Sequence, residues 1–224
     1  MTNVVNQINL LKGGVSNTWK PVKKNTIYFF VGTGVNIAKM NFGGTSPGFS
    51  TLDYSTSVTP SFRAGGDFAT GRNLQRFILR TELAYNTLKF TGTSTIDQGS
   101  GFERDVNYNI QLNMISPSVN ALYVILSGKM DIYLGLGVVC NITKSTNEHV
   151  TTYKNDQPPV VIDPFRDIQK AWWGVNGKAG VMINKKFDVN INYCPGSFVR
   201  YALYTAGADM LGLQLNYRFP GSKV

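Results

Sequence analysis

The sequence predicts an all-β fold, an eight-stranded antiparallel up-and-down transmembrane β-barrel. Several segments alternate between apolar and polar residues with the two-residue period of a strand. The links between these segments alternate between tight turns and long polar loops. Only 16% of the 224 residues are charged, whereas 12% are aromatic. No run of about eighteen apolar residues occurs, as a membrane helix would need, but alternating strands need none.

The closing segment, residues 211–219, shows the clearest alternation. Its apolar positions, Leu211, Leu213, Leu215, Tyr217 and Phe219, are separated by glycine or polar residues. Segments 187–193 and 131–138 repeat the pattern. The remaining strands are expected at 26–42, 58–70, 74–90, 108–123 and 171–184, which gives eight in total.

The expected links alternate in length along the chain. Long polar loops are expected at residues 43–56, 91–107 and 144–170, tight turns at 71–73, 127–129 and 184–186, and an intermediate link at 202–209. Short periplasmic turns and longer outer loops are typical of outer-membrane barrels. We therefore expect one barrel domain, residues 25–219, in a bacterial outer membrane with both termini periplasmic. Residues 1–24 would be a periplasmic arm, a lumen plug or a disordered segment, and 220–224 a tail.

The first residues show no basic start, apolar core or cleavage site of an export signal. We expect a mature sequence from which a leader has been removed, and a barrel that is not exported would explain the absence equally well.

Half of the basic residues fall at the tight-turn end, and the net charge is +9. They are Lys12, Lys20, Lys23, Lys24, Arg72, Arg76, Lys129, Lys185, Lys186, Arg218 and Lys223. Such a rim suits anionic lipid headgroups or an acidic periplasmic partner. Alternatively, these side chains only keep the turns solvated.

Aromatic residues gather near the expected strand ends, as in the girdles of membrane barrels. The tight-turn end has Phe29, Phe77, Tyr123, Phe187, Tyr217 and Phe219, and the loop end Phe42, Tyr85, Phe90, Trp172, Trp173, Tyr193, Tyr201 and Tyr204.

Three short motifs resemble those of small OmpA-type outer-membrane barrels, most closely the PorT-like outer membrane protein β-barrel family of Bacteroidota. The pattern Gly212, Leu215, Tyr217 and Phe219 looks like the signal read by the barrel assembly machinery. Residues 80–85 (Arg-Thr-Glu-Leu-Ala-Tyr) and Ile115-Ser-Pro117 are similar to strand motifs of the PorT-like barrels. This resemblance implies a non-enzymatic anchor or accessory subunit of an envelope transport or secretion assembly. The five residues after Phe219 depart from the pattern, in which the aromatic residue ends the chain.

Alternation assigns a charged set to the face opposite the apolar one. The expected lumen charges are Arg63, Asp67, Arg80, Glu82, Asp131, Lys178, Asp188 and Arg218. Eight strands leave an interior that side chains fill, so these charges must pair or contact trapped water. We favour a salt-bridged plug over a narrow solute pore. Glycines on the same face, such as Gly32, Gly135 and Gly180, either make room for long side chains or open a channel.

The sequence gives little support to catalysis. The single histidine, His149, lies in an expected loop without a nucleophile motif, and Gly32-Thr-Gly34 lacks the lysine of a phosphate loop. Cys140 should point outward and Cys194 inward, so no disulfide is expected. The basic residues share no single face, so nucleic acid is not an expected partner. We expect no enzyme, cofactor or metal.

The proline-rich part of the longest expected loop is a candidate partner-binding segment, with Pro158, Pro159, Pro164 and Phe165. An inert surface loop is the alternative. Expected partners are outer-membrane lipid, the assembly machinery and other envelope proteins. A soluble, lipocalin-like ligand-binding barrel also remains open, because alternation alone does not say which face points outward.

Overall fold

The computed structural model describes residues 26–44, 53–69, 76–97, 103–153, 158–162, 169–200, 204–219 and 221–223. Eight long strands form the barrel: β1 (Thr26–Gly44), β3 (Ser57–Ala69), β4 (Phe77–Asp97), β5 (Glu103–Leu126), β6 (Met130–Tyr153), β8 (Ala171–Ile183), β9 (Phe187–Arg200) and β10 (Tyr204–Arg218). Three short strands, β2 (Asp53–Tyr54), β7 (Val160–Ile162) and β11 (Ser222–Lys223), pair beside them.

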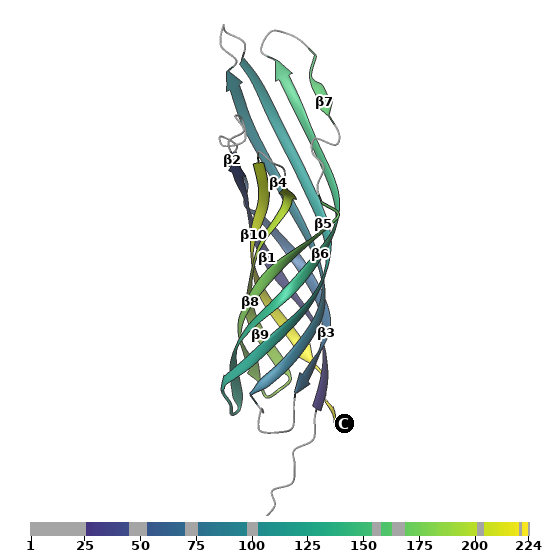
Figure 1. The fold of residues 1–224 in the computed structure, drawn as a ribbon, viewed down its shortest axis with the longest axis vertical. Helices are drawn as coiled ribbons and strands as arrows, with labels where there is room; N and C mark the ends of the chain where they lie inside the picture. Colours follow the sequence, from purple (N-terminus) through teal and green to yellow (C-terminus); the bar gives the residue numbers. More distant parts are fainter. Residues whose placement is uncertain are drawn as a thin grey trace, which may run out of the picture.

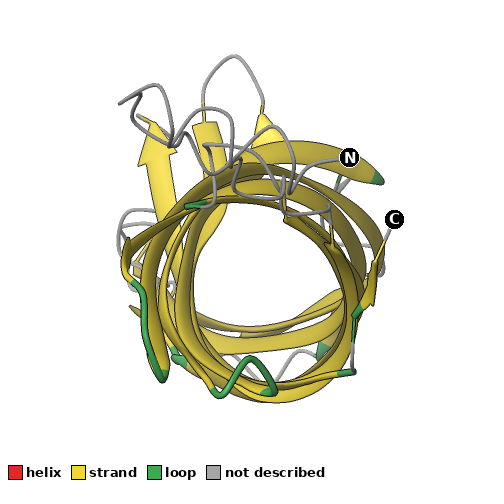
Figure 2. Cartoon of the chain, turned by 90° about the horizontal axis from the view of Figure 1, so that it is seen from below, coloured by secondary structure: helices red, strands yellow, loops and turns green. Residues whose placement is uncertain are grey.

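Each barrel strand pairs antiparallel with its neighbours along the chain, and the first strand pairs with the last. The β1–β10 seam runs from Phe30 opposite Arg218 to Gly44 opposite Tyr204. Seen along its axis, the sheet forms a closed ring (Figure 2). The predicted eight-stranded antiparallel up-and-down barrel is therefore confirmed. In the described part of the chain, no helix has the length and apolarity required to cross a membrane.

Strands β4, β5 and β6 are much longer than expected and rise above the rest of the barrel (Figure 1). Strands β4 and β5 stay paired up to Asp97 opposite Glu103, and β5 and β6 up to Arg104 opposite Tyr153. Strand β8 leaves β6 much earlier, at Ile142 opposite Ala171. We call residues 87–97, 103–114 and 143–153 the projecting sheet.

The predicted loops were wrong over most of the projecting sheet. Within the expected loops, residues 91–97, 103–107 and 144–153 all form strand. Short strands pair with the outer edges of the sheet: β2 lies against Gly92 and Thr93, and β7 against residues 149–151. The link expected at 202–209 is also shorter, because β10 already begins at Tyr204.

The two faces of the sheet exchange character where it leaves the barrel. The outward side chains up to Tyr85 on β4 and Ile115 on β5 are apolar except for Thr81, and the next outward side chains, Thr87 and Asn113, are polar. Inward side chains change in the opposite sense, from polar Asn86 to apolar Leu88, which is fully buried. These strand segments were missed because a strand with polar outward residues resembles a polar loop in the sequence.

Two apolar clusters of buried side chains lie toward the two ends of the lumen. At the loop end, the buried cluster comprises Ala38, Met40, Leu88, Phe90, Tyr108, Ile110, Leu112, Met114, Val139, Trp172, Cys194, Ala208 and Met210. A smaller cluster at the tight-turn end comprises Ile78, Leu122, Val124, Tyr133 and Met182. Charged side chains of the lumen reach the smaller cluster, where Arg218 Nη1 lies 3.2 Å from Met182 Sδ.

The aromatic girdles are only partly as expected. All six aromatic residues expected at the tight-turn end are exposed, and Phe77–Tyr123, Phe187–Tyr217 and Tyr217–Phe219 are in ring contact. At the loop end Tyr85, Trp173 and Tyr193 are exposed, but Phe90 (0% exposed) and Trp172 (3%) point inward and belong to the apolar cluster. The side chains of Phe42, Tyr201 and Tyr204 lie outside the described set.

Most of the described residues of the expected basic rim are exposed, but one is buried in the lumen. Arg76, Lys129, Lys185 and Lys186 are exposed at the tight-turn end. Arg218, expected both on the rim and in the lumen, is 2% exposed and lies in the lumen.

Part of the expected tail forms β11, which pairs with the first residues of β1. Residues 1–24 lie outside the described ranges.

The turn between β8 and β9 tests how strongly local backbone strain limits stability. Asn184 and Lys185 have φ angles of 50° and 57°, a conformation that matches strand twist but is costly for lysine. We expect Lys185→Gly to raise the free energy of unfolding by about 0.5–1 kcal/mol, measured by urea unfolding of the folded barrel. Lys186→Gly is the matched control. It should lower stability, because glycine there adds chain entropy without relieving strain.

Candidate functional site in the barrel lumen

The guanidinium of Arg80 lies at the centre of the lumen and is fully buried. Arg80 and Asp67 are direct partners across β3 and β4, so the register brings them together. Arg80 Nε donates to Asp67 Oδ1 at 2.6 Å, and Nη2 donates to Asp67 Oδ2 at 2.9 Å. Arg80 Nη1 donates to Asp188 Oδ2 of β9 at 2.6 Å. A paired fork of this kind is the strongest geometry that a buried arginine can adopt.

Other side chains complete the partners of the two aspartates. Tyr133 Oη donates to Asp188 Oδ1 at 2.8 Å, and Asn216 Nδ2 donates to Asp188 Oδ2 at 3.0 Å. Arg218 Nη2 lies 2.9 Å from Asp67 Oδ2. We call Asp67, Arg80, Tyr133, Asp188, Asn216 and Arg218 the Arg80 cluster. It connects strands that are not neighbours in the sheet.

Aromatic rings flank both arginines of this cluster. The Arg80 Cζ atom lies 4.8 Å from the centre of the Phe30 ring and 5.7 Å from that of Tyr133. The Arg218 Cζ atom lies 4.4 Å from the centre of the Tyr28 ring. Rings at these distances stabilise a desolvated guanidinium by cation–π attraction.

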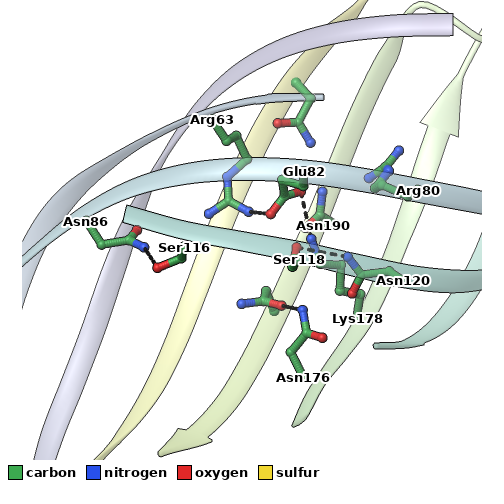
Figure 3. Close-up of polar contacts among 12 residues, drawn as sticks. Arg63, Arg80, Glu82, Asn86, Ser116, Ser118, Asn120, Asn176, Lys178 and Asn190 are labelled. Carbon is green, nitrogen blue, oxygen red and sulfur yellow. Dashed lines mark hydrogen bonds and ion pairs between the residues drawn. The ribbon is translucent and has the colours of Figure 1, made fainter. Parts of the chain in front are cut away.

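A second group of charged side chains lies nearer the loop end, where one glutamate accepts hydrogen bonds from two basic side chains. Arg63 Nη1 donates to Glu82 Oε1 at 2.7 Å, and Lys178 Nζ donates to Glu82 Oε2 at 2.8 Å. All three side chains are buried, and Figure 3 shows both contacts. We call these residues the Glu82 triad.

The lumen glycines make room for these large side chains. A Cβ atom on Gly65 would lie 2.6 Å from the Phe30 ring, and one on Gly180 would lie 2.7 Å from the Tyr133 ring. Real Cβ atoms do not approach so closely. At these two levels the space beside the glycines is therefore filled by the aromatic partners of Arg80.

A layer of amide and hydroxyl groups lies between the Glu82 triad and the apolar cluster at the loop end. Asn36 Nδ2 donates to Asn86 Oδ1 at 2.6 Å, and Asn86 Nδ2 donates to Ser116 Oγ at 3.3 Å. Ser116 Oγ in turn donates to Asn141 Oδ1 at 2.7 Å. This amide layer was missed in the sequence, although its residues occupy the same lumen-facing parity as the predicted charges.

The other predicted site residues belong neither to the Arg80 cluster nor to the Glu82 triad. Asp131 accepts hydrogen bonds from Ser127 Oγ and Gly128 N, both at 3.0 Å, and so fixes the turn between β5 and β6. Cys194 is buried in the lumen, Cys140 is half-buried on the outward parity, and both are free thiols. The backbone of His149 pairs with Ile162 of β7.

The closing pattern lies at the end of β10, and the two PorT-like motifs lie on the neighbouring strands β4 and β5. Leu215, Tyr217 and Phe219 point outward beside the β1–β10 seam, and Gly212 points inward toward Asn36. The two PorT-like motifs lie side by side, with Leu83 opposite Pro117 and Tyr85 opposite Ile115. Pro158 and Pro159 are exposed, whereas Pro164 and Phe165 are outside the described residues.

Comparisons with known proteins find low similarity to several solved bacterial surface and outer-membrane proteins. No protein-family model and no curated protein sequence matches the chain. Among solved structures, Neisserial surface protein A is 11% identical, with a TM-score of 0.41, 85% of this chain covered and 97% of that one. The outer membrane protein OprG from Pseudomonas aeruginosa is 12% identical, with a TM-score of 0.43 and coverages of 88% and 97%. Ail of Yersinia pestis is 12% identical, with a TM-score of 0.35 and coverages of 86% and 98%. TM-scores below 0.5 do not establish a shared fold, so the barrel is defined by its own strand pairing.

Removal of the Arg80 guanidinium should be far more damaging than removal of an exposed base. Arg80→Met leaves Asp188 and Asp67 in the lumen with fewer cationic partners, and breaking a buried ion pair costs about 3–5 kcal/mol. We expect that loss in the free energy of urea unfolding. Arg76→Ala, at the exposed tight-turn end, should change it by less than about 0.5 kcal/mol. Equal effects of the two substitutions would show that the Arg80 cluster contributes no stability.

Proposed function

We propose that this chain is an integral β-barrel of the bacterial outer membrane, with its tight turns and termini on the periplasmic side. The observation that carries the proposal is the apolar belt, a band of exposed hydrophobic side chains on all eight barrel strands. It includes Val31, Val35, Ile37, Phe62, Leu79, Leu83, Ile115, Val119, Leu134, Leu136, Val138, Trp173, Val175, Val189, Ile191, Leu211, Leu213 and Leu215. Leu136 is 70% exposed and Trp173 72%.

A water-soluble barrel would reverse this arrangement. Soluble monomers rarely expose an apolar patch larger than a few hundred Å², and a lipocalin-like barrel keeps its apolar side chains inside. Here Arg80, Asp67 and Lys178 are buried in the lumen while leucine and valine face outward. Lipid is the solvent in which such a surface is stable. This geometry argues against the soluble ligand-binding alternative.

Within the membrane, we infer an anchoring role in an envelope assembly rather than catalysis. The polar projecting sheet stands above the apolar belt and offers a rigid surface outside the lipid (Figure 1). The buried apolar clusters and the paired charges that fill the lumen favour a closed barrel. Membership of the PorT-like family, and dependence on the barrel assembly machinery through Gly212, Leu215, Tyr217 and Phe219, belong to the same proposal.

A narrow solute pore is the second candidate, and the Glu82 triad favours it. Two cations, Arg63 and Lys178, share one carboxylate, so either could release it and leave the lumen less constricted. The apolar cluster at the loop end would still have to open, which is why we favour the closed barrel.

An arginine placed on the outward face should report the depth of each strand position in lipid. Leu136→Arg, within the belt, should lower the free energy of unfolding in lipid vesicles by about 2–4 kcal/mol, and Thr91→Arg, above the belt, should lower it by less than about 1 kcal/mol. In a soluble barrel Leu136→Arg would be tolerated as well as Thr91→Arg. A detergent-free, monodisperse monomer would likewise contradict the membrane proposal.

Conductance separates the anchor from the pore. We expect the purified protein, reconstituted in planar lipid bilayers, to give no stable open-channel current, because buried apolar side chains and paired charges fill the lumen. A reproducible current that changes when Glu82 is replaced by glutamine would instead support the pore. The arginine-scanning result would stand in either case.

A further inference from the structure

The Glu82 triad holds one positive charge more than the acids around it balance. In the Arg80 cluster the charges cancel, because Arg80 and Arg218 face Asp67 and Asp188. In the triad, Arg63 and Lys178 face Glu82 alone. The fourth lumen acid, Asp131, accepts its hydrogen bonds from the turn between β5 and β6. A surplus charge in a buried lumen is costly unless a counter-ion or strong hydrogen bonds stabilise it.

A small cavity lies directly beside this surplus charge. Its volume is about 40 Å³, and its lining includes Arg63 and Glu82 of the triad together with Asn36, Asn86, Asn141 and Asn176. A water molecule needs roughly 10–15 Å³ on the same scale, so the cavity has room for about three water-sized occupants. It lies within the amide layer, below the apolar cluster.

Two of the cavity-lining residues have a buried donor without a partner. Arg63 Nε and the Nδ2 atom of Asn141 make no hydrogen bond within the described part of the chain. Both residues are more than nine-tenths buried. The Oδ1 atom of Asn176 is likewise unpartnered and buried, and as an acceptor it suits a water molecule next to the occupant. Asn176 lies on β8, the strand that also carries Lys178 of the triad, and Figure 3 shows both residues.

We propose that this cavity binds a small monovalent inorganic anion of halide size. Such an ion supplies the charge that the triad lacks and accepts hydrogen bonds from Arg63 Nε and Asn141 Nδ2. Larger organic anions do not fit in the cavity. The site does not depend on the membrane proposal, because the charges and the cavity lie entirely within the lumen.

Bromide is the direct probe, because its anomalous scattering distinguishes it from water. Crystals of the detergent-solubilised wild-type protein grown in sodium bromide should show an anomalous peak in the cavity, within hydrogen-bond distance of Arg63 Nε and Asn141 Nδ2. A cavity that contains only water would overturn the proposal, and an uncharged Lys178 would then account for the missing anion.

A fixed carboxylate in the cavity should replace the ion. Asn141→Asp keeps the oxygen that accepts from Ser116 and adds a negative charge. We expect the urea unfolding midpoint of the wild type to rise with chloride when gluconate is exchanged for it at constant ionic strength, and this dependence to be lost in Asn141→Asp. Asn107→Asp makes the same change at an exposed position of β5, outside the lumen, and should retain the chloride dependence.

Other outcomes are also decisive. Equal chloride dependence in all three proteins, or none in the wild type, would overturn the proposal. If Asn141→Asp does not fold, the bromide experiment on the wild type decides alone. Neither result alters the arginine test of the apolar belt.

Discussion

The buried guanidinium of Arg80 is the interaction on which the rest of the structure depends. It binds Asp67 of β3 and Asp188 of β9, and so joins opposite walls of the barrel through a single side chain. None of these charges is stable in a dry interior without its partners. The cluster therefore exists only when the sheet is closed, and closure in turn buries the cluster. The flanking Phe30 and the small Gly65 and Gly180 follow from the need to fit one large cation into an eight-stranded lumen.

The outward face of β4 changes from mostly apolar to polar along the strand. From Phe77 to Tyr85 the outward side chains are mostly apolar, and the inward ones include Arg80 and Glu82. From Thr87 onward the outward side chains are polar and Leu88 and Phe90 are buried inside. No bulge interrupts the pairing of β4 with β5 at this point. The apolar residues thus move from the outward to the inward positions of the strand. In the proposed orientation, this exchange marks the level at which the surroundings of the barrel change from lipid to water.

The barrel and its lumen charges could be predicted from the sequence because alternation has a period of two and repeats on every strand. Parity alone places Arg63, Glu82 and Lys178 on one face. It does not say which base pairs with which acid, since that depends on the register between strands, nor that Asp131 would be held by its own turn. The projecting sheet was missed because this exchange made Thr91 and Asn109 look like loop residues. Phe90 and Trp172 were predicted in a girdle because they lie near the expected strand ends, but their parity places both side chains inside the barrel.

The short strands β2 and β7 have a consequence for how the projecting sheet can be recognised. An uncovered strand edge is a template onto which another chain can add a strand, and natural sheets block such edges against aggregation. Here the edge of β4 is occupied at Gly92 and Thr93, and that of β6 at residues 149–151. Backbone pairing with another chain at these positions is therefore confined to the outer edges of β2 and β7, which have only two and three residues. Such short edges give another chain little to pair with, so a partner of the projecting sheet would have to bind mainly through side chains.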